Sequence, residues 1–309
     1  MAGILQQETY TPPMIKPNFF IVGAPKCGTT AMDHYLKQHP DIFMAQKSLD
    51  FFGADLPLKM KRTEAEYLSN FIDAYKKKIV GDASVFYLYS RTAAYEIRAL
   101  SPEAKILIML RNPVILIHAL HSQNIYEGNE DEADFEKAIQ LDEERKKGDR
   151  QPKCVDFTFL PPYKDIALFS EQVKRYLDVF GKEKVHIIIY EEFAKDPETS
   201  TKEVLTFLGV DPGISIQYKV INPNKKIRFL FLHRLIKTPA TWLRPIVRFL
   251  IPVKRIRHKI MSVLQEKNIA VSKRNKMNPE TEKDLKTFFA DDIAALSKLI
   301  NRDLMSIWE

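Results

Sequence analysis

The chain has 309 residues, of which 45% are hydrophobic and 28% are charged, and its net charge is +7. This is ample for a buried core and ordinary for a soluble enzyme, and one large α/β domain or two small ones would fit the length. No apolar run reaches the roughly 18 residues of a membrane-spanning helix. Two cysteines, Cys27 and Cys154, exclude a disulfide framework.

The first 17 residues lack the basic region and the long apolar region of a secretory signal. We therefore expect residues 1–17 to be an N-terminal tail and the protein to be cytoplasmic. Residues 18–309 contain no internal repeat and no low-complexity linker, so we expect them to form a single domain.

Strand-like apolar runs alternate with helix-like stretches along this domain. The runs lie at 19–22, 79–80, 106–110 and 185–190, and the helix-like stretches at 29–38, 63–75, 92–100, 113–126, 134–146, 164–180, 199–208 and 280–300. The alternation predicts an α/β fold with a central parallel sheet and helices on both faces. In such sheets ligands bind at the carboxyl ends of the strands.

The first strand-like run is followed by the sequence VGAPKCGTTA and then by a helix-like stretch. Gly23 and Gly28 allow a tight turn, and backbone N–H groups at the start of the helix point at one place. Thr29 and Thr30 add hydroxyl donors, and Lys26 adds a full positive charge. The pattern predicts an anion-binding loop, with an ordinary strand–helix turn as the alternative.

This loop differs from the ATP-binding loop, in which the lysine follows the last glycine. An NTPase also needs a carboxylate after a second buried strand to hold Mg²⁺. Here Arg111 follows the run 106–110 instead. A cation at that place argues against a metal–triphosphate site and indicates a second phosphate contact.

The positive charge is concentrated near the C-terminal end of the sequence. Residues 219–276 contain 16 Lys/Arg and one acidic residue, whereas the rest of the chain contains 31 basic and 39 acidic residues. We expect a basic helical, cap-like segment over 215–276. Its alternatives are a helical subdomain with a solvated charged face, and an interfacial membrane helix.

Taken together, these motifs resemble the PAPS-dependent sulfotransferases, especially their bacterial and carbohydrate-type branch, in which PAPS is 3′-phosphoadenosine 5′-phosphosulfate. The resemblance extends over most of the chain. Its specific motifs are FIVGAPKCGTTA (20–31) and LRNPV (110–114), and weaker ones include GDAS (81–84), YEEF (190–193) and MNPET (277–281). The resemblance implies a P-loop-like sheet, with PAPS as donor, PAP as product and no metal.

The resemblance also implies roles for individual residues. Arg111 would hold the 3′-phosphate of the nucleotide, although the serine expected eight residues later is replaced by Ala119. Lys273 and Arg274 correspond to a basic nucleotide-binding loop, with solvated charges as the alternative. The loop that would hold the 5′-phosphosulfate consists of Lys26, Cys27, Gly28, Thr29 and Thr30.

Sulfuryl transfer also needs a general base for the acceptor. Related enzymes read KEPHFF in the loop after the first helix, with the Glu or the His as base, whereas this chain reads KSLDFF from Lys47. We therefore predict that Asp50 is the base or orients the acceptor, with Asp82 as the second candidate. His118 and His121 are further candidates for the base. They rank last, because they lie on a mostly apolar helix, where a histidine packed in a structural role is the alternative.

The implied reaction is in-line and metal-independent, and Lys26 stabilises the leaving phosphate. We predict a small-molecule acceptor in a pocket lined by Asp50, Phe52, Phe86 and Tyr87, although these aromatic rings could equally belong to the core. A carbohydrate acceptor is the alternative. A further one is a non-catalytic module that binds a nucleotide or a membrane. No nucleic-acid partner is expected.

Overall fold

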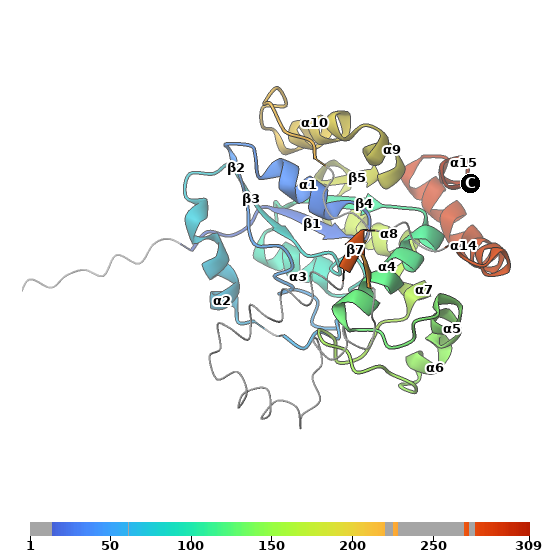
Figure 1. Cartoon of the computed structure of the whole chain (residues 1–309). Coiled ribbons are helices and arrows are strands. Elements are labelled where there is room, and N and C mark those ends of the chain that lie inside the picture. The colour runs from blue at the N-terminus through green and yellow to red at the C-terminus, as the bar shows by residue number, and fades with distance from the viewer. Residues whose placement is uncertain (1–13, 61, 220–224, 228–268, 272–275) are drawn as a thin grey trace, which may run out of the picture.

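The computed structural model describes residues 14–60, 62–219, 225–227, 269–271 and 276–309. Its centre is a five-stranded parallel sheet with the strand order β2-β3-β1-β4-β5 (Figure 1). The strands are β1 (Phe19–Gly23), β2 (Ile42–Met44), β3 (Ile79–Ala83), β4 (Lys105–Leu110) and β5 (Val185–Ile189). The predicted parallel α/β sheet is confirmed.

The central strands are apolar because helices cover both faces of the sheet. Every residue of β1 and β3 is buried, and so are the last five residues of β4. Near-continuous apolar runs are typical of parallel strands that are buried on both sides. The edge strand β2 has only three residues, which is too short for an apolar run to predict it.

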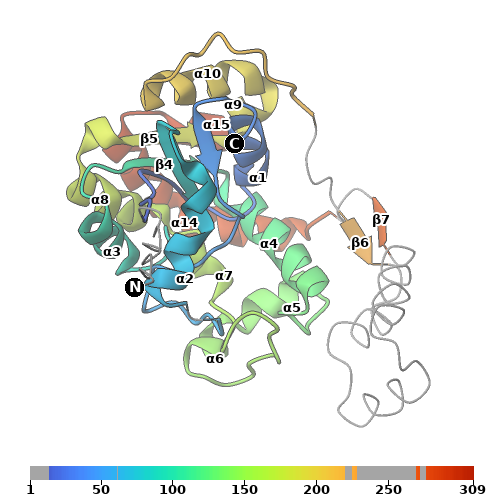
Figure 2. The same cartoon turned by 90° about the vertical axis from the view of Figure 1, so that its left-hand side faces the viewer.

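Helices α1 (Thr29–Leu36) and α10 (Pro197–Leu208) cover one face of the sheet, and α3 (Ala93–Leu100) and α8 (Phe169–Phe180) cover the other (Figures 1 and 2). The long helix α14 (Pro279–Ile300) packs on α8. The remaining elements are α2 (Glu64–Leu68), η1 (Ser69–Ala74), α4 (Pro113–Glu127), α5 (Phe135–Gln140), α6 (Asp142–Lys146), α7 (Tyr163–Ile166), η2 (Lys182–Lys184), α9 (Tyr190–Lys195), α15 (Leu304–Trp308) and the antiparallel pair β6 (Lys225–Ile227) and β7 (Ile269–Val271).

Several predicted helices begin where the sequence supplies a capping residue. Thr63 and Glu66 form a capping box at the start of α2. Asn112, Asp196 and Asn278 each cap a helix whose first residue is proline. The predicted helix over 63–75 is α2 followed by the 3₁₀ turn η1, and the stretch 134–146 is divided into α5 and α6.

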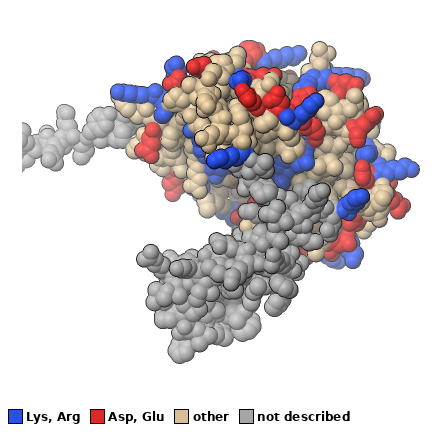
Figure 3. All heavy atoms as spheres, turned by 45° about the horizontal axis from the view of Figure 1, so that its top comes forward, with Lys and Arg blue, Asp and Glu red and all other residues tan. Residues whose placement is uncertain are grey.

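The basic, cap-like segment predicted at 215–276 lies largely outside the described residues, and so do Lys273 and Arg274. Over the face drawn in Figure 3, basic and acidic side chains of the described residues are interspersed. In the described part of the chain, no helix combines the length and the apolar character needed to cross a bilayer.

Candidate active site

The predicted anion-binding loop connects β1 to α1 at the carboxyl end of the sheet. Lys26 and Gly28 have left-handed backbones, with φ of 64° and 86°, and Gly28 immediately precedes the first turn of α1. The first N–H groups of a helix lack partners within the helix and are suited to bind an anion. Burial raises the pKa of the Cys27 thiol, so this side chain stays neutral and any contribution to anion binding comes from its backbone.

Helix α9 packs against this loop. A Cβ atom placed on Gly28 would lie 2.9 Å from Cε1 of Phe193 and 3.2 Å from Cδ2 of Tyr190. The sequence predicted a strand that included Tyr190, but β5 ends at Ile189 and Tyr190 begins α9. The close contact requires glycine at position 28.

Gly28→Ala should therefore lower the free energy of unfolding by about 1–3 kcal/mol and weaken PAP binding, because it combines a left-handed backbone with a clash. Gly148→Ala is the matched control: φ at Gly148 is 90°, and no atom lies within 4 Å of a Cβ placed there. Denaturant unfolding and calorimetric titration with PAP measure the two effects. Equal losses in both variants would contradict a role for the contact with α9.

Arg111, which follows β4, lies beside the same loop. Its Nη1 donates a hydrogen bond to the Lys26 carbonyl oxygen at 3.2 Å, and its guanidinium carbon lies 4.2 Å from the centroid of the Tyr190 ring. Its buried Nε has no hydrogen-bond partner within the described part of the chain. A buried N–H group usually has a partner, so this atom fits an anionic ligand at the loop.

The turn that carries Arg111 is held by two helices that sequence reasoning did not place at the site. Asn112 donates from Nδ2 to the Trp308 carbonyl oxygen at 2.6 Å, and its backbone N–H donates to Glu191 at 3.3 Å. The indole of Trp308 donates to the other oxygen of Glu191 at 3.0 Å. Helices α9 and α15 thus fix the start of α4.

Lys47 is a candidate site residue that sequence reasoning missed. Its Nζ donates to Thr29 Oγ1 at 2.9 Å and also to Thr30 Oγ1. Burial lowers the pKa of Lys47 to about 8, with Asp33 opposing the shift and Lys26 adding to it. The signal is the first residue of the KSLDFF motif, which is Lys47 itself.

Asp50 lies in the same loop, with a left-handed backbone at φ 50°. Burial raises the pKa of its carboxyl to about 7; Asp82 and Asp156 raise it further, whereas Arg62 and Lys47 oppose them. A pKa near neutrality suits a general base, because a substantial fraction of the group is ionised near neutral pH and still accepts a proton readily.

Asp82, the second candidate base, lies at the end of β3 and has no exposed surface. Its carboxylate accepts hydrogen bonds from the hydroxyls of Tyr67, Ser84 and Tyr87 at 2.8–3.0 Å. Burial raises its pKa to about 6 despite these bonds. In this structure an acceptor molecule has no access to the carboxylate.

The candidate acceptor-binding aromatic residues differ in their surroundings. Phe52 is 3% exposed and Tyr87 is fully buried, and their ring centroids lie 5.5 Å apart. Phe86 is half-buried and packs against Phe157. The structure therefore favours the core interpretation for Phe52 and Tyr87, whereas Phe86 keeps an accessible edge.

The two histidines predicted as reserve bases lie on α4 and pack against Phe135 of α5. His121 is buried, and its Nε2 lies 2.8 Å from the Glu132 carbonyl oxygen. The His118 ring lies 4.7 Å from the Phe135 ring. Ala119 is buried, and the nearby Ser122 hydroxyl is bonded to the His118 carbonyl oxygen at 3.0 Å. These contacts favour structural roles.

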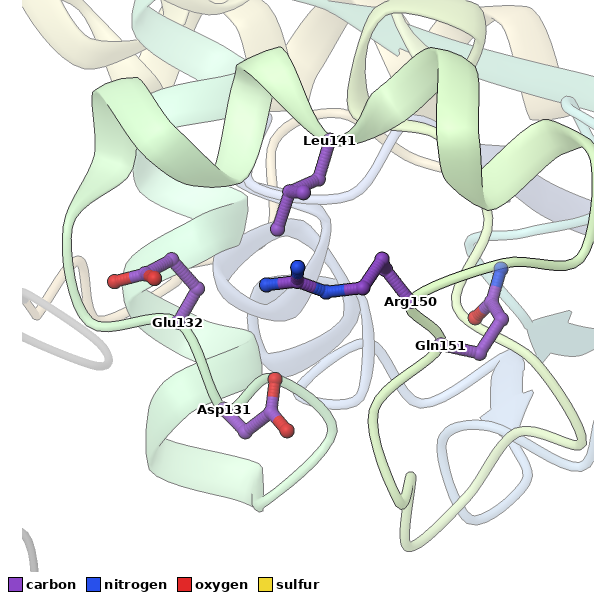
Figure 4. Close-up of a pocket in the computed structure, with 5 residues that line it drawn as sticks. All are labelled: Asp131, Glu132, Leu141, Arg150 and Gln151. Carbon is purple, nitrogen blue, oxygen red and sulfur yellow. The ribbon is translucent and has the colours of Figure 1, made fainter.

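A surface hollow of about 280 Å³ lies elsewhere, between the α4–α5 connection and the loop after α6. Figure 4 shows the Arg150 guanidinium extending towards the side of Asp131 and Glu132. None of the predicted site residues lines this hollow, so side-chain chemistry rather than cavity size locates the candidate site. Among the described residues, no group of three or more His, Cys, Asp or Glu side chains is arranged to hold a metal ion.

Known proteins match this chain over most of its length. The family model of the sulfotransferase domain matches residues 16–297. A crystal structure of a sulfotransferase from Alicyclobacillus acidocaldarius is similar, with a TM-score of 0.70 and 31% identity, and the alignment covers 95% of this chain and 99% of that one.

Two curated relatives are more distant. The membrane-associated sulfotransferase kil1 of Dictyostelium discoideum is 22% identical over 72% of this chain and 61% of its own length. Carbohydrate sulfotransferase 15 of Rattus norvegicus is 26% identical over 63% of this chain and 44% of its own length. This chain thus spans less than two thirds of either relative. The match of the domain over nearly the whole chain shows that it belongs to the sulfotransferase family, which uses PAPS as its sulfuryl donor.

Proposed function

We propose that this protein transfers the sulfuryl group of PAPS to a hydroxyl, or an amine, of a small-molecule metabolite. The observation that carries the proposal is the meeting of two loops at the carboxyl end of the sheet. The loop after β1 supplies Lys26 and the threonines, and the loop after β2 brings Lys47 onto those threonines. The second loop also carries Asp50.

In the proposed reaction, the acceptor oxygen or nitrogen forms a bond to sulfur while the bond from sulfur to the phosphate oxygen of PAPS breaks. The acceptor loses its proton to Asp50, and the electron pair of the broken bond remains on the phosphate of PAP. Lys26 and Lys47 stabilise the charge that develops there. Arg111 binds the 3′-phosphate, and the scheme requires no metal.

The charge near Asp50 supports a small acceptor over an anionic glycan. Asp82 and Asp156 raise the pKa of Asp50, whereas Arg62 and Lys47 oppose them. The carboxylate of Asp50 itself stands where related enzymes carry a histidine, and it repels a polyanion more than a neutral alcohol or an amine. A carbohydrate hydroxyl is the second candidate, because the rat relative is a carbohydrate sulfotransferase.

The single domain over 18–309, the cap-like segment at 215–276 and the cytoplasmic location remain predictions. So do the nucleotide contacts of Lys273 and Arg274. In the alternative of a non-catalytic module, the protein would bind PAP or a membrane without turnover.

Incubation with PAPS and a mixed panel of alcohols, amines and neutral sugars tests the proposal. Mass spectrometry should show one acceptor gaining a single SO₃ group, and PAP should accumulate in equal amount. Lys26→Ala should lower this rate by about 10²–10³-fold, the usual cost of removing one preorganised charge donor. An unchanged rate in Lys26→Ala would overturn the assigned site, and PAP binding without any sulfated acceptor would favour the non-catalytic alternative.

A further inference from the structure

Asp82 is the centre of a buried polar cluster that the proposed chemistry does not use directly. We name Asp82, Tyr67, Ser84 and Tyr87 the Asp82 cluster. Oδ2 of Asp82 accepts from the hydroxyls of Tyr67 at 3.0 Å and Tyr87 at 2.9 Å, and Oδ1 accepts from Ser84 Oγ at 2.8 Å. All four residues are buried, so these bonds exchange little with water.

Two of the three hydroxyls also contact the loop that carries Asp50. Ser84 Oγ accepts a hydrogen bond from the Asp50 N–H at 3.1 Å, and the Tyr87 hydroxyl accepts from the Phe51 N–H at 2.9 Å. A hydroxyl that donates a hydrogen bond to a carboxylate can still accept a hydrogen bond from another donor through its lone pairs. Asp82 therefore orients both hydroxyls to receive the backbone of this loop.

The loop needs such support, because its backbone is unfavourable. Ser48 and Asp50 both have left-handed backbones, with φ of 62° and 50°. Non-glycine residues keep this conformation only when the surroundings fix it. Other bonds assist: the Ser48 N–H donates to the Ala83 carbonyl oxygen at 2.9 Å, and Arg62 Nε donates to the Leu49 carbonyl oxygen at 2.8 Å.

We propose that Asp82 is a positioning residue of the transfer reaction: through Ser84 and Tyr87 it fixes the backbone of residues 50–52 and so places the Asp50 carboxylate for proton acceptance. This inference rests on the proposed function of Asp50. Asp82 itself touches neither donor nor acceptor, since it is fully buried.

Asp82 acts on Asp50 through its charge as well. Burial raises the pKa of Asp50 most, and the charge of Asp82 comes second. Asp156 raises this pKa less, whereas Arg62 and Lys47 lower it. Removing the charge at position 82 should therefore lower the pKa of Asp50, and the rise of activity with pH should begin at lower pH. A purely structural role would change stability without moving that profile.

The two tyrosines offer a matched pair of variants. Tyr67→Phe and Tyr87→Phe each remove one hydroxyl from the same oxygen of Asp82, at distances of 3.0 Å and 2.9 Å. Of these two hydroxyls, only that of Tyr87 also accepts a hydrogen bond from the backbone of the Asp50 loop. Both rings remain in place, but Tyr87→Phe also leaves the Phe51 N–H without its acceptor and should lose more stability than Tyr67→Phe.

The test is kcat and KM for PAPS in Tyr87→Phe, Tyr67→Phe and Ser84→Ala, with thermal unfolding as the control. We expect kcat to fall about 10- to 100-fold in Tyr87→Phe, since a small displacement of a reacting group costs that much. The KM for PAPS should not change. The kcat of Tyr67→Phe should stay within about 2-fold of wild type, because this variant keeps the ring that packs on Phe51 and removes no hydrogen bond from the loop. Ser84→Ala should show a similar loss of kcat. It takes the place of Tyr87→Phe in the test if Tyr87→Phe does not fold.

Asp50→Asn and the pH profile of Asp82→Asn complete the test. If Asp50→Asn is inactive but Tyr87→Phe and Tyr67→Phe have equal kcat, the positioning role is wrong and the proposed function stands. An unshifted profile in Asp82→Asn would likewise overturn the effect of its charge. If Asp50→Asn keeps the wild-type kcat, the proposed base is wrong and the inference fails with it.

Discussion

Lys47→Ala should lower kcat for sulfuryl transfer by about 10²–10³-fold, an effect as large as that of removing a donor from an oxyanion hole. Lys47 holds the hydroxyls of Thr29 and Thr30 at the start of α1, so its charge lies at the anion-binding loop. The partly buried position strengthens its interaction with a phosphate, because less water screens the charge. Steady-state kinetics with saturating PAPS measures the loss.

Lys37→Ala is the matched control for this variant. Lys37 is a second lysine near the loop, and its charge lowers the pKa of Lys47. Its side chain is exposed, however, and its hydrogen bond goes to Asp33 at 2.9 Å rather than to the loop threonines. The kcat of Lys37→Ala should stay within about 2-fold of wild type, because the exposed Lys37 ammonium pairs with Asp33 and makes no bond to the loop threonines. Similar losses in both variants would mean that general surface charge, rather than the contact with the threonines, supports transfer.

The pH profile gives Lys47 a second readout. Its pKa is lowered to about 8 by burial, with Asp33 and Asp50 opposing and Lys26 and Lys37 reinforcing the shift. Lysine is charged below its pKa, so kcat/KM should fall as pH rises through about 8. The negative charge of bound PAPS should raise this pKa, so the fall should weaken in kcat. Lys47→Arg should abolish it, because arginine stays charged.

The sequence predicted those parts of the site that are encoded locally. The loop from Gly23 to Thr30 follows an apolar strand directly, and Arg111 follows the next central strand, so parallel pairing alone brings them to one edge of the sheet. These features depend on short segments whose periodicity and turn residues are sufficient to place them.

The missed features depend on contacts between distant segments. Lys47 reaches back 17 and 18 residues to the threonines of α1. The burial of Asp82 follows from Tyr67 and Tyr87, which close over it from α2 and from the turn after β3. The sequence alone does not show whether a carboxylate at a strand end is buried or can act as a base. That depends on which residues from distant segments pack around it.

Asp50→Asn should lower kcat by about 10²–10⁴-fold, the range for loss of a positioned general base. Asparagine has the same shape and tolerates a left-handed backbone, so the loss reports proton acceptance rather than a rearranged loop. Wild-type activity should rise with pH through about 7, because burial, and then the charge of Asp82, raise the pKa of Asp50 to that value. Below it the carboxyl is protonated and accepts no proton. This rise belongs to the coupled carboxylates and should be absent from the residual activity of Asp50→Asn.

Asp156→Asn changes the charge near Asp50 but keeps the Asp50 carboxylate, so it tests the pKa of the base apart from its presence. Asp156 raises the pKa of Asp50, and its own carboxylate is exposed and held by Asn129 at 2.9 Å. The variant should move the rise of activity to lower pH and keep the maximal kcat, because the proton acceptor is still present. If Asp50→Asn retained both the maximal rate and the rise near neutral pH, the titrating group would be another one. The carboxyl of Asp50 would then serve acceptor binding, and KM for the acceptor would be the parameter that changes.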